Sequence, residues 1–354
     1  MIDIGLLLAS VLSLFFIYSI IKYAPVLGLI DTPNERSSHR NPIPKGAGVG
    51  FTLAALITLA LLHWEIVASN LWSIGAIFLV MLTGLMDDIK NCRPRFKFTG
   101  ILIAVLMINM DDVGISSLGT YFGLNIELAW FLVLPFTYFA VAGFTNALNL
   151  IDGIDGLAGG ISLVILVTYL AIGIKFDDAF LAVVSAAFAL ALIIFMVFNW
   201  NPARIFMGDS GSLTLGFVIA FLSIKALAYI NPTIVLFVAA MPLLDTFSVM
   251  RRRKQRGQSI FKADKNHLHH ILLNQKRDVR FTARMLILIQ VVFSMIGYRS
   301  IGQDDAWNIF LFGVLFVIFF NLFDPRMRRR KKKEKNQVTH PMQIALREDQ
   351  AEVA

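Results

Sequence analysis

The sequence has little cysteine and little charge. Its single cysteine, Cys92, excludes a disulfide within the chain and a cysteine-based zinc site. Charged residues make up only 16% of the 354 residues, whereas 57% are hydrophobic and the mean hydropathy is +0.69. A water-soluble protein of this size needs far more charge to cover its surface. The shortage therefore excludes a soluble globular protein and favours one that lies in a membrane.

Apolar segments of spanning length recur from one end of the chain to the other. Each is about as long as a helix needs to cross the ~30 Å hydrocarbon core of a bilayer. We therefore predict an all-α polytopic integral membrane protein with roughly eleven transmembrane helices. The predicted segments are 4–24, 47–63, 71–86, 98–114, 128–148, 157–174, 178–198, 211–230, 232–250, 282–299 and 306–323. The first lacks the basic start and cleavage site of a signal peptide, so we expect it to be retained.

Lysine and arginine are scarce in every second connection between these segments. The first connection, 25–46, and every second connection after it hold nearly all the loop bases. The connections between them hold only Lys175 and Arg299. The positive-inside rule makes the basic side cytoplasmic, with the N-terminus outside and the C-terminus inside. The predicted cytoplasmic loops are 25–46, 87–97, 149–156, 199–210 and 251–281.

The end of the chain differs in composition from the rest. We predict one transmembrane domain at 1–323, followed by a basic, disordered cytoplasmic tail at 324–354. The bases of the tail suit the anionic head groups of membrane lipids. The formal net charge of +8 therefore reflects topology, and we predict no nucleic-acid partner.

Acidic residues gather at the predicted cytoplasmic ends of the spans. The motifs MDDIKNCRPRFK, NLIDGIDGLAGG and NPARIFMGDSGSLTLG supply Asp87, Asp88, Asp152, Asp155 and Asp209. Carboxylates this close together repel one another until a proton or a cation intervenes. An oxygen-only donor set without cysteine favours a hard divalent cation, Mg²⁺ or in its place Mn²⁺.

Basic residues and histidines accompany these acids. Lys45 and Lys97 lie in the same group of loops. An arginine-rich run precedes the motif KADKNHLHHIL, which holds His267, His269 and His270. Carboxylates and a divalent cation beside bases suit a diphosphate, which is held by positioning and charge neutralisation. Because the surroundings are apolar, we predict phosphoryl transfer between a cytosolic nucleotide and a membrane lipid.

Each acidic motif also has an explanation that needs no chemistry. The pair Asp87 and Asp88 could be a solvated helix end, although the helix dipole disfavours acids at a C-terminus. Asp152 and Asp155 could belong to a glycine-rich turn. Asp209 or the serine that follows it could cap the next span by accepting from its free amides.

The other motifs have alternatives of the same kind. Lys45 could be a topology charge only. The three histidines could hold a transition metal, although without a carboxylate or thiol they fit hydrogen bonds to phosphate better. Asp245 lies about one turn inside the ninth predicted span, where a helix-packing hydrogen bond is the expected role.

Five motifs follow one another in the order found in a known family: LGLIDTPNERSSHRNPIPKGAGVGF, GLMDDIK, NALNLIDGIDGLAGG, NWNPARIFMGDSGSLTLGF and RRRKQRGQSIFKADKNHLHHIL. They resemble the bacterial polyprenyl-phosphate N-acetylhexosamine-1-phosphate transferases, glycosyltransferase family 4, over about residues 25–273. The resemblance implies eleven helices around a cytoplasmic cleft, in the bacterial cytoplasmic (inner) membrane. It also implies that a UDP-N-acetylhexosamine reacts with undecaprenyl phosphate, giving a lipid-linked diphosphate sugar and UMP. That reaction is the first membrane step of surface polysaccharide or cell-wall glycan synthesis.

The resemblance also assigns roles by motif position. Asn149 and Asp209 would hold Mg²⁺. Asp87 and Asp88 would engage the lipid phosphate or the metal, as catalytic residues together with Asp209. The substrate-binding residues would be Lys45, Lys97, Asp152, Asp155, His267, His269 and His270. The motif PKGAG departs from many relatives, which have a second glycine at the position of Ala47.

The histidine motif DKNHLHH resembles the WecA-type branch, which serves surface polysaccharides. GlcNAc is the default sugar of that branch, and GalNAc, QuiNAc and FucNAc are alternatives. The lipid phosphate is largely dianionic at neutral pH, since its second pKa lies near ~6. We therefore expect Asp87 and Asp88 to position substrates and metal rather than to act as a base.

Two other classes of protein are weighed against this interpretation. A transporter would hold ionisable groups near the bilayer midplane, whereas here the acids gather at the predicted cytoplasmic ends of the spans, with Lys225, Arg284 and Asp245 inside predicted spans. A non-catalytic scaffold need not keep the set of acids. An oligomer is compatible with the sequence.

Overall fold

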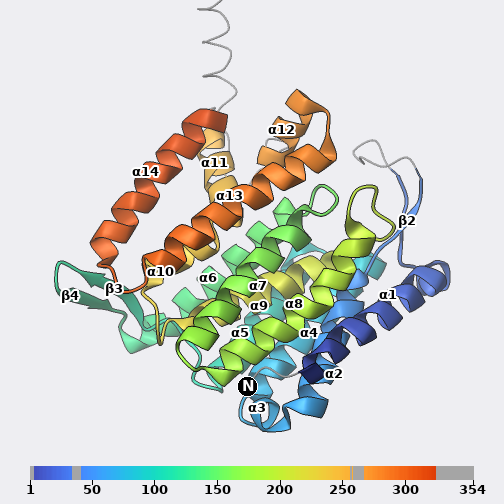
Figure 1. Ribbon diagram of the computed structural model, residues 1–354, viewed down its shortest axis with the longest axis horizontal. Helices are drawn as coiled ribbons and strands as arrows, with labels where there is room; N and C mark the ends of the chain where they lie inside the picture. The colour runs from blue at the N-terminus through green and yellow to red at the C-terminus, as the bar shows by residue number, and fades with distance from the viewer. Residues whose placement is uncertain (1–3, 34–40, 256, 258–266, 324–354) are drawn as a thin grey trace, which may run out of the picture. The chain divides into compact units, whose positions relative to one another are not determined.

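The computed structural model describes residues 4–33, 41–255, 257 and 267–323, most of them helical (Figure 1). The chain divides into a first unit that ends at Ile309 and a second that begins at Phe310. In the second unit the described residues, 310–323, are helical. The tail predicted at 324–354 lies outside the described residues.

Each of the eleven predicted apolar segments contains a helix, because a helix satisfies the backbone hydrogen bonds of an apolar segment within itself. In chain order the helices are η1 (Ile4–Leu7), α1 (Leu8–Leu27), α2 (Ala47–Leu62), α3 (Trp64–Ala68), α4 (Leu71–Lys90), α5 (Pro94–Asn109), α6 (Trp130–Ile151), α7 (Leu157–Lys175), α8 (Ala179–Asn199), α9 (Asp209–Ala226), α10 (Pro232–Val238), α11 (Ala240–Gln255), α12 (Leu268–Lys276), α13 (Val279–Arg299) and α14 (Asp305–Phe323).

Among the described residues, eight helices are long and apolar enough to cross a membrane, counting η1 with α1, and α10 with α11 makes a bent ninth. The apolar helix α2 is shorter, with 16 residues. The structure therefore agrees with a polytopic membrane protein, while the count of eleven spans and their orientation stay predictions.

The ninth predicted span, 232–250, is wrong as a single helix. α10 and α11 meet at 86°. Pro242 lies in the first turn of α11, where a proline prevents a continuous helix because it has no N–H and crowds the preceding turn. Gln290 of α13 replaces the lost backbone bonds. Its Nε2 donates to the Val238 carbonyl at 2.7 Å, and its Oε1 accepts from the Met241 N–H at 2.9 Å.

The prediction of an all-α protein needs correction, because two short antiparallel strand pairs accompany the helices. β1 (Ile30–Asp31) pairs with β2 (Ile43–Pro44), and β3 (Ser117–Tyr121) pairs with β4 (Leu124–Glu127). β2 leads directly into the PKGAG motif. The Phe206 N–H donates to the Pro44 carbonyl at 2.8 Å, and the Ala47 N–H donates to the Phe206 carbonyl at 3.2 Å. These bonds join the loop before α2 to the loop before α9.

α9 is the most buried of the long helices and packs against α2, α4 and α6 (Figure 1). Glycines allow this approach at its N-terminus. A Cβ on Gly48 of α2 would lie 2.0 Å from the Gly211 nitrogen, and one on Gly84 of α4 would lie 2.4 Å from the Asp209 carbonyl oxygen. Because real side chains do not tolerate such distances, these glycines fix the first turn of α9 between two neighbouring helices.

Candidate active site

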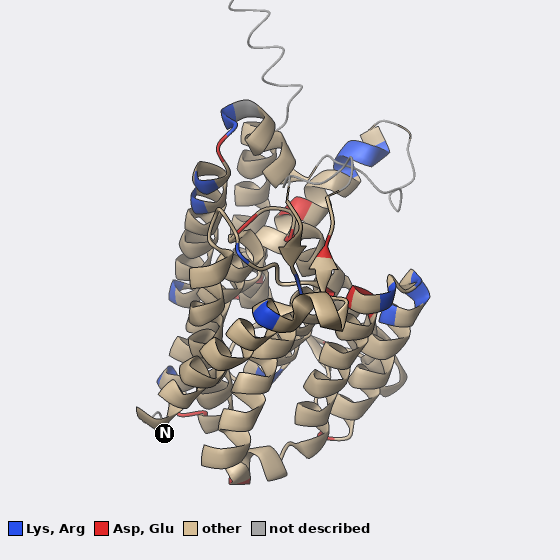
Figure 2. Ribbon diagram, turned by 90° about the vertical axis from the view of Figure 1, so that its right-hand side faces the viewer, with Lys and Arg blue, Asp and Glu red and all other residues tan. Residues whose placement is uncertain are grey.

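The predicted motifs meet in a cavity of about 720 Å³ at the end of α4, α6 and α9. Acidic and basic positions come together at this end of the first unit (Figure 2). Of the predicted site residues, the cavity is lined by Lys45, Asp87, Asp88, Asn149, Asp152, Asp155, Asp209 and His270. The motifs therefore share one end of the protein. Which side of the membrane that end faces stays a prediction.

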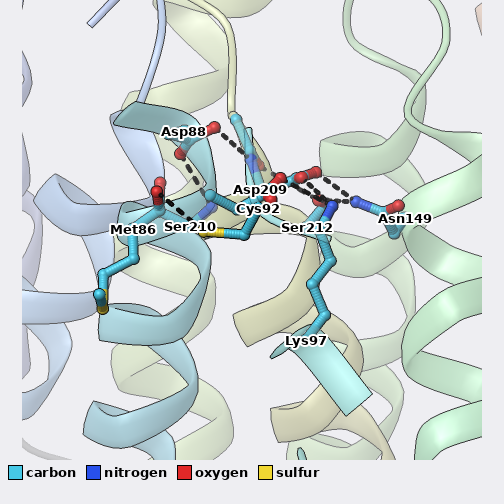
Figure 3. A network of polar contacts seen from close by, with 10 residues as sticks. Met86, Asp88, Cys92, Lys97, Asn149, Asp209, Ser210 and Ser212 are labelled. Carbon is cyan, nitrogen blue, oxygen red and sulfur yellow. Dashed lines mark hydrogen bonds and ion pairs between the residues drawn. The ribbon is translucent and has the colours of Figure 1, made fainter. Parts of the chain in front are cut away.

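Lys97 bridges two carboxylates beside this cavity. Its Nζ lies 2.7 Å from Asp87 Oδ2 and also donates to Asp209 Oδ2. On the other side of Asp209, Asn149 Nδ2 donates to Oδ1 at 2.6 Å and to Ser212 Oγ at 2.8 Å (Figure 3). The ammonium group offsets the repulsion between the two acids, which can then remain ionised close together.

Asp88 fixes the start of α9 (Figure 3). Its Oδ1 accepts from the Asp209 N–H at 2.8 Å and its Oδ2 from the Ser210 N–H at 2.9 Å. These amides have no partner within their own helix, so Asp88 of α4 acts as the cap of α9. Neither Asp209 nor Ser210 caps the helix, since the capping position is Gly208, with φ +72°. A Cβ there would lie 2.5 Å from Asp88 Oδ2.

The turn between α6 and α7 carries two acids with different surroundings. Asp155 Oδ2 accepts from Asn201 Nδ2 at 2.8 Å and from the Ala203 N–H at 3.1 Å, so it holds the loop that leads to α9. Asp152 lies in the cavity wall. Burial, reinforced by the nearby charges of Asp209, Asp88 and Asp155, raises the pKa of Asp152 to about 7.

The three histidines of the HLHH motif occupy different surroundings. His270 lines the cavity. His267 is buried, with Nδ1 2.8 Å from Asp245 Oδ2. His269 is buried as well, and burial lowers the pKa of its imidazole to about 3, so it is neutral. The structure thus places one of the three in the cavity wall and the other two behind it.

The arrangement of donors fits a hard divalent cation. Asp87 Oδ1 is buried and has no hydrogen-bond partner among the described residues. Within that same part of the chain, no group of three His, Cys, Asp or Glu side chains forms a complete metal site. A cation beside Asp87 and Asp209 would therefore take further oxygens from Asn149 and from a bound phosphate. Mg²⁺ suits such a shell, since it uses few carboxylates and completes its coordination with substrate phosphates.

A smaller cavity, of about 160 Å³, has Lys97 in its wall. It shares Asn149 with the main cavity, and the two have no other lining residue in common. Cys92 lies in its wall, and apolar side chains from α5 and α9 line it too: Phe98, Ile101 and Leu213.

Several residues of the main cavity were not predicted from the sequence. They are Asp31, Asn91, Asn199, Phe206 and Asn274. Asp31, Asn91, Asn199 and Phe206 lie inside quoted motifs, so the motifs signalled their positions although no role was assigned to them. Asn91 ends α4 in a left-handed conformation, with φ 48°. Asn274 lies four residues after His270 on α12, so the two share a helix face, and that spacing from the histidine motif was the available signal.

The chain is similar to known proteins of one family. Residues 70–227 match the sequence profile of glycosyl transferase family 4. An undecaprenyl-phosphate alpha-N-acetylglucosaminyl 1-phosphate transferase of Escherichia coli (strain K12) is 31% identical over 351 residues, which cover 93% of this chain and 91% of that protein. The protein of the same name from Yersinia pestis is 29% identical over 91% of this chain and 95% of that protein. A probable undecaprenyl-phosphate N-acetylglucosaminyl 1-phosphate transferase of Bacillus subtilis (strain 168) is 29% identical, over 88% of each chain.

Proposed function

Because the chain belongs to glycosyl transferase family 4, we propose that it transfers GlcNAc-1-phosphate from UDP-GlcNAc to undecaprenyl phosphate and releases UMP. The observation that carries the proposal is the cavity in which Lys45, the acids and His270 meet beside the Lys97 bridge. A cavity of about 720 Å³ is of the size that takes a nucleotide-sized ligand. The reaction would start surface polysaccharide or cell-wall glycan synthesis at the cytoplasmic face of the inner membrane.

The bond changes follow from the product. An oxygen of the lipid phosphate attacks the phosphorus that carries the sugar, and the bond from that phosphorus to the oxygen of UMP breaks. Since the attacking phosphate is largely dianionic at neutral pH, no proton has to be removed from it. The main barrier is repulsion between two anions. Lys45 in the cavity wall and Lys97 beside it offset that repulsion.

The metal-binding residues of this proposal are Asp87, Asp209 and Asn149, with Mg²⁺ or in its place Mn²⁺. When bound, such a cation would neutralise diphosphate charge and stabilise the negative charge on the departing UMP. The chain's own residues prepare the place for it. Asp88 fixes the backbone of Asp209 through two N–H bonds, and Asn149 orients the Asp209 carboxylate through its side-chain amide.

The lipid phosphate would approach from the smaller cavity. The apolar side chains of that cavity, Phe98, Ile101 and Leu213, suit a lipid, and Lys97 and Asn149 lie in its wall as well. The nucleotide sugar would occupy the main cavity, where Asp152 and His270 lie. The two substrates would then meet at the Lys97 bridge.

A reconstituted reaction tests the proposal. Purified protein is incubated with undecaprenyl phosphate, Mg²⁺ and a panel of UDP-sugars, and the lipid is analysed by mass spectrometry. We expect a diphosphate-linked GlcNAc lipid, UMP, and loss of product on chelation. Product from UDP-GalNAc, UDP-QuiNAc or UDP-FucNAc in place of UDP-GlcNAc would keep the reaction and change the sugar. Labelled sugar entering sealed proteoliposomes without any lipid product would overturn the proposal in favour of transport.

A further inference from the structure

A buried carboxylate on α11 holds the start of the histidine helix α12. Asp245 is 2% exposed, and both of its oxygens are used. Oδ2 lies 2.8 Å from His267 Nδ1, and Oδ1 accepts from the Leu268 N–H at 2.7 Å. His267 is the capping position of α12 and makes no side-chain cap of its own. Asp245 therefore supplies the cap of α12 from a different helix.

The next residue of α12 packs against the turn that carries Asp152. His269 is 1% exposed, and neither of its ring nitrogens has a hydrogen-bond partner among the described residues. A Cβ on Gly153 would lie 2.2 Å from His269 Nε2. The imidazole thus rests directly on a glycine of the DGIDG motif, and a larger residue there would require the His269 side chain to shift. His270, the following residue, lines the main cavity.

Together these contacts form a chain of packing from α11 to the cavity. Asp245 holds His267 and the first amide of α12, His269 sets the distance from α12 to the α6–α7 turn, and His270 completes the wall. We propose that Asp245 is a positioning residue for the nucleotide-sugar side of the reaction: it sets the place of His270 in the cavity wall through α12. The inference rests on the proposed function, because the ligand of that wall is taken to be the UDP-sugar.

The carboxylate and the amide differ in what they can do here. An ionised carboxylate only accepts, so it fixes the His267 imidazole with a proton on Nδ1. In Asp245→Asn, one atom can still accept from the Leu268 N–H, but the amide nitrogen then faces His267 Nδ1 and favours the opposite tautomer. Asp245→Leu keeps the branching of the side chain at Cγ and loses both bonds. The asparagine variant should therefore retain more function than the leucine variant.

Steady-state kinetics of the full-length protein test this order. For Asp245→Leu we expect the KM for UDP-GlcNAc to rise about tenfold, with a smaller rise for Asp245→Asn and little change in the KM for undecaprenyl phosphate. The matched control is Asp305→Asn. Asp305 is also buried, at 1% exposed, and also accepts from a backbone N–H, that of Thr120 at 2.8 Å, but it lies outside the main cavity. Equal changes in both KM values, or the same KM changes in the control, would overturn the inference.

A double-mutant cycle separates positioning from general destabilisation. If Asp245 acts by placing His270, Asp245→Leu should raise the donor KM by about twofold or less in the His270→Gln background. An equal rise in the donor KM with His270 and with His270→Gln would show that Asp245 acts elsewhere.

Hydrogen exchange gives a readout that needs no substrate. Amides of α12, Leu268–Lys276, should exchange faster in Asp245→Leu than in the wild-type protein. Unchanged exchange would overturn the positioning role. Two results together would count against the proposed function alone. The wild-type protein would make no lipid product, and α12 would still exchange faster in Asp245→Leu than in the wild type.

Discussion

Asp209 is the residue at which the contacts of the site converge. It receives hydrogen bonds from Lys97 and Asn149 through its side chain, and from its backbone N–H it donates to Asp88. Asp209→Asn keeps the backbone bond and the shape of the side chain but loses the charge. We expect kcat to fall about a thousandfold, which corresponds to about 4 kcal/mol of transition-state stabilisation.

The measurement is the rate of lipid product formation at saturating substrates, with thermal unfolding to show that the variant is folded. Asp178→Asn is the matched control. Asp178 caps α8 by accepting from the Leu181 N–H at 2.7 Å, outside the main cavity. Near-normal turnover of Asp209→Asn at ordinary Mg²⁺ would show that this carboxylate has no part in the reaction.

Asp152 makes stability depend on pH. Burial raises its pKa from 3.8 to about 7, so the folded protein keeps a proton that the unfolded chain loses near pH 4. The unfolded state therefore binds fewer protons between these values, and stability falls as the pH rises from about 4 to 7, then becomes level. In chelator-treated protein, we expect Tm of the wild type to fall relative to Asp152→Asn across this range, by a few degrees. Parallel Tm curves for the two proteins would contradict the shifted pKa.

At the residue scale, the sequence shows which side chains matter better than it shows what each one contacts. The acids were predicted because carboxylates beside apolar segments are costly and need a reason. Asp88 and Asp155, however, accept hydrogen bonds from the backbone amides of Asp209 and Ala203. These partners lie far along the chain, and no local pattern links them. A sequence pattern therefore predicts which residues form the group, whereas the contact that each of them makes is found only in the structure.

At the element scale, the break between α10 and α11 depends on one side chain of α13. Gln290→Leu would leave the Val238 carbonyl and the Met241 N–H without their partner, and each buried unsatisfied group costs ~1–3 kcal/mol. We expect a loss of at least about 2 kcal/mol in the free energy of unfolding. Denaturation of purified variants measures it.

Gln290→Glu serves as the graded control, because the buried carboxyl in its neutral, protonated form still accepts from Met241 and donates to Val238, but must hold a proton to do so. Its loss should be intermediate. Since α11 carries Asp245, we also expect the donor KM to rise in Gln290→Leu. A Gln290→Leu protein as stable as the wild type would mean that the break does not need its side-chain support.

The helices themselves were largely predictable, because apolar composition forces a segment in lipid to bond within itself. Breaks and strand pairs were not. Pro242 was visible in the sequence, but polytopic spans often contain proline, and the Gln290 contact that stabilises a sharp break comes from 49 residues away. β1 and β2 are two residues each, too short for any alternating pattern.

At the scale of the whole molecule, the membrane orientation stays a prediction that a labelling experiment decides. The main cavity gathers residues from connections assigned to the cytoplasm, whereas Leu124 lies in the β3–β4 hairpin, which was assigned outside. In a Cys92→Ser background, a membrane-impermeant thiol reagent added to intact cells should label Leu124→Cys. It should not label Gln255→Cys, at the exposed end of α11, until the inner membrane is opened. The reverse pattern would put the cavity on the side away from cytoplasmic nucleotide sugars.

The division of the lining residues into two cavities has a consequence for the order of substrate binding. Since the two cavities share only Asn149 among their lining residues, the proposed placing of donor and acceptor would let both be bound at the same time. Direct transfer within a ternary complex then needs no sugar-phosphate attached to the protein. Initial-velocity plots for the two substrates should intersect rather than run parallel, and labelled UMP should not exchange into UDP-GlcNAc while undecaprenyl phosphate is withheld. Parallel plots with such exchange would mean that the chain carries the sugar-phosphate itself, in two half-reactions.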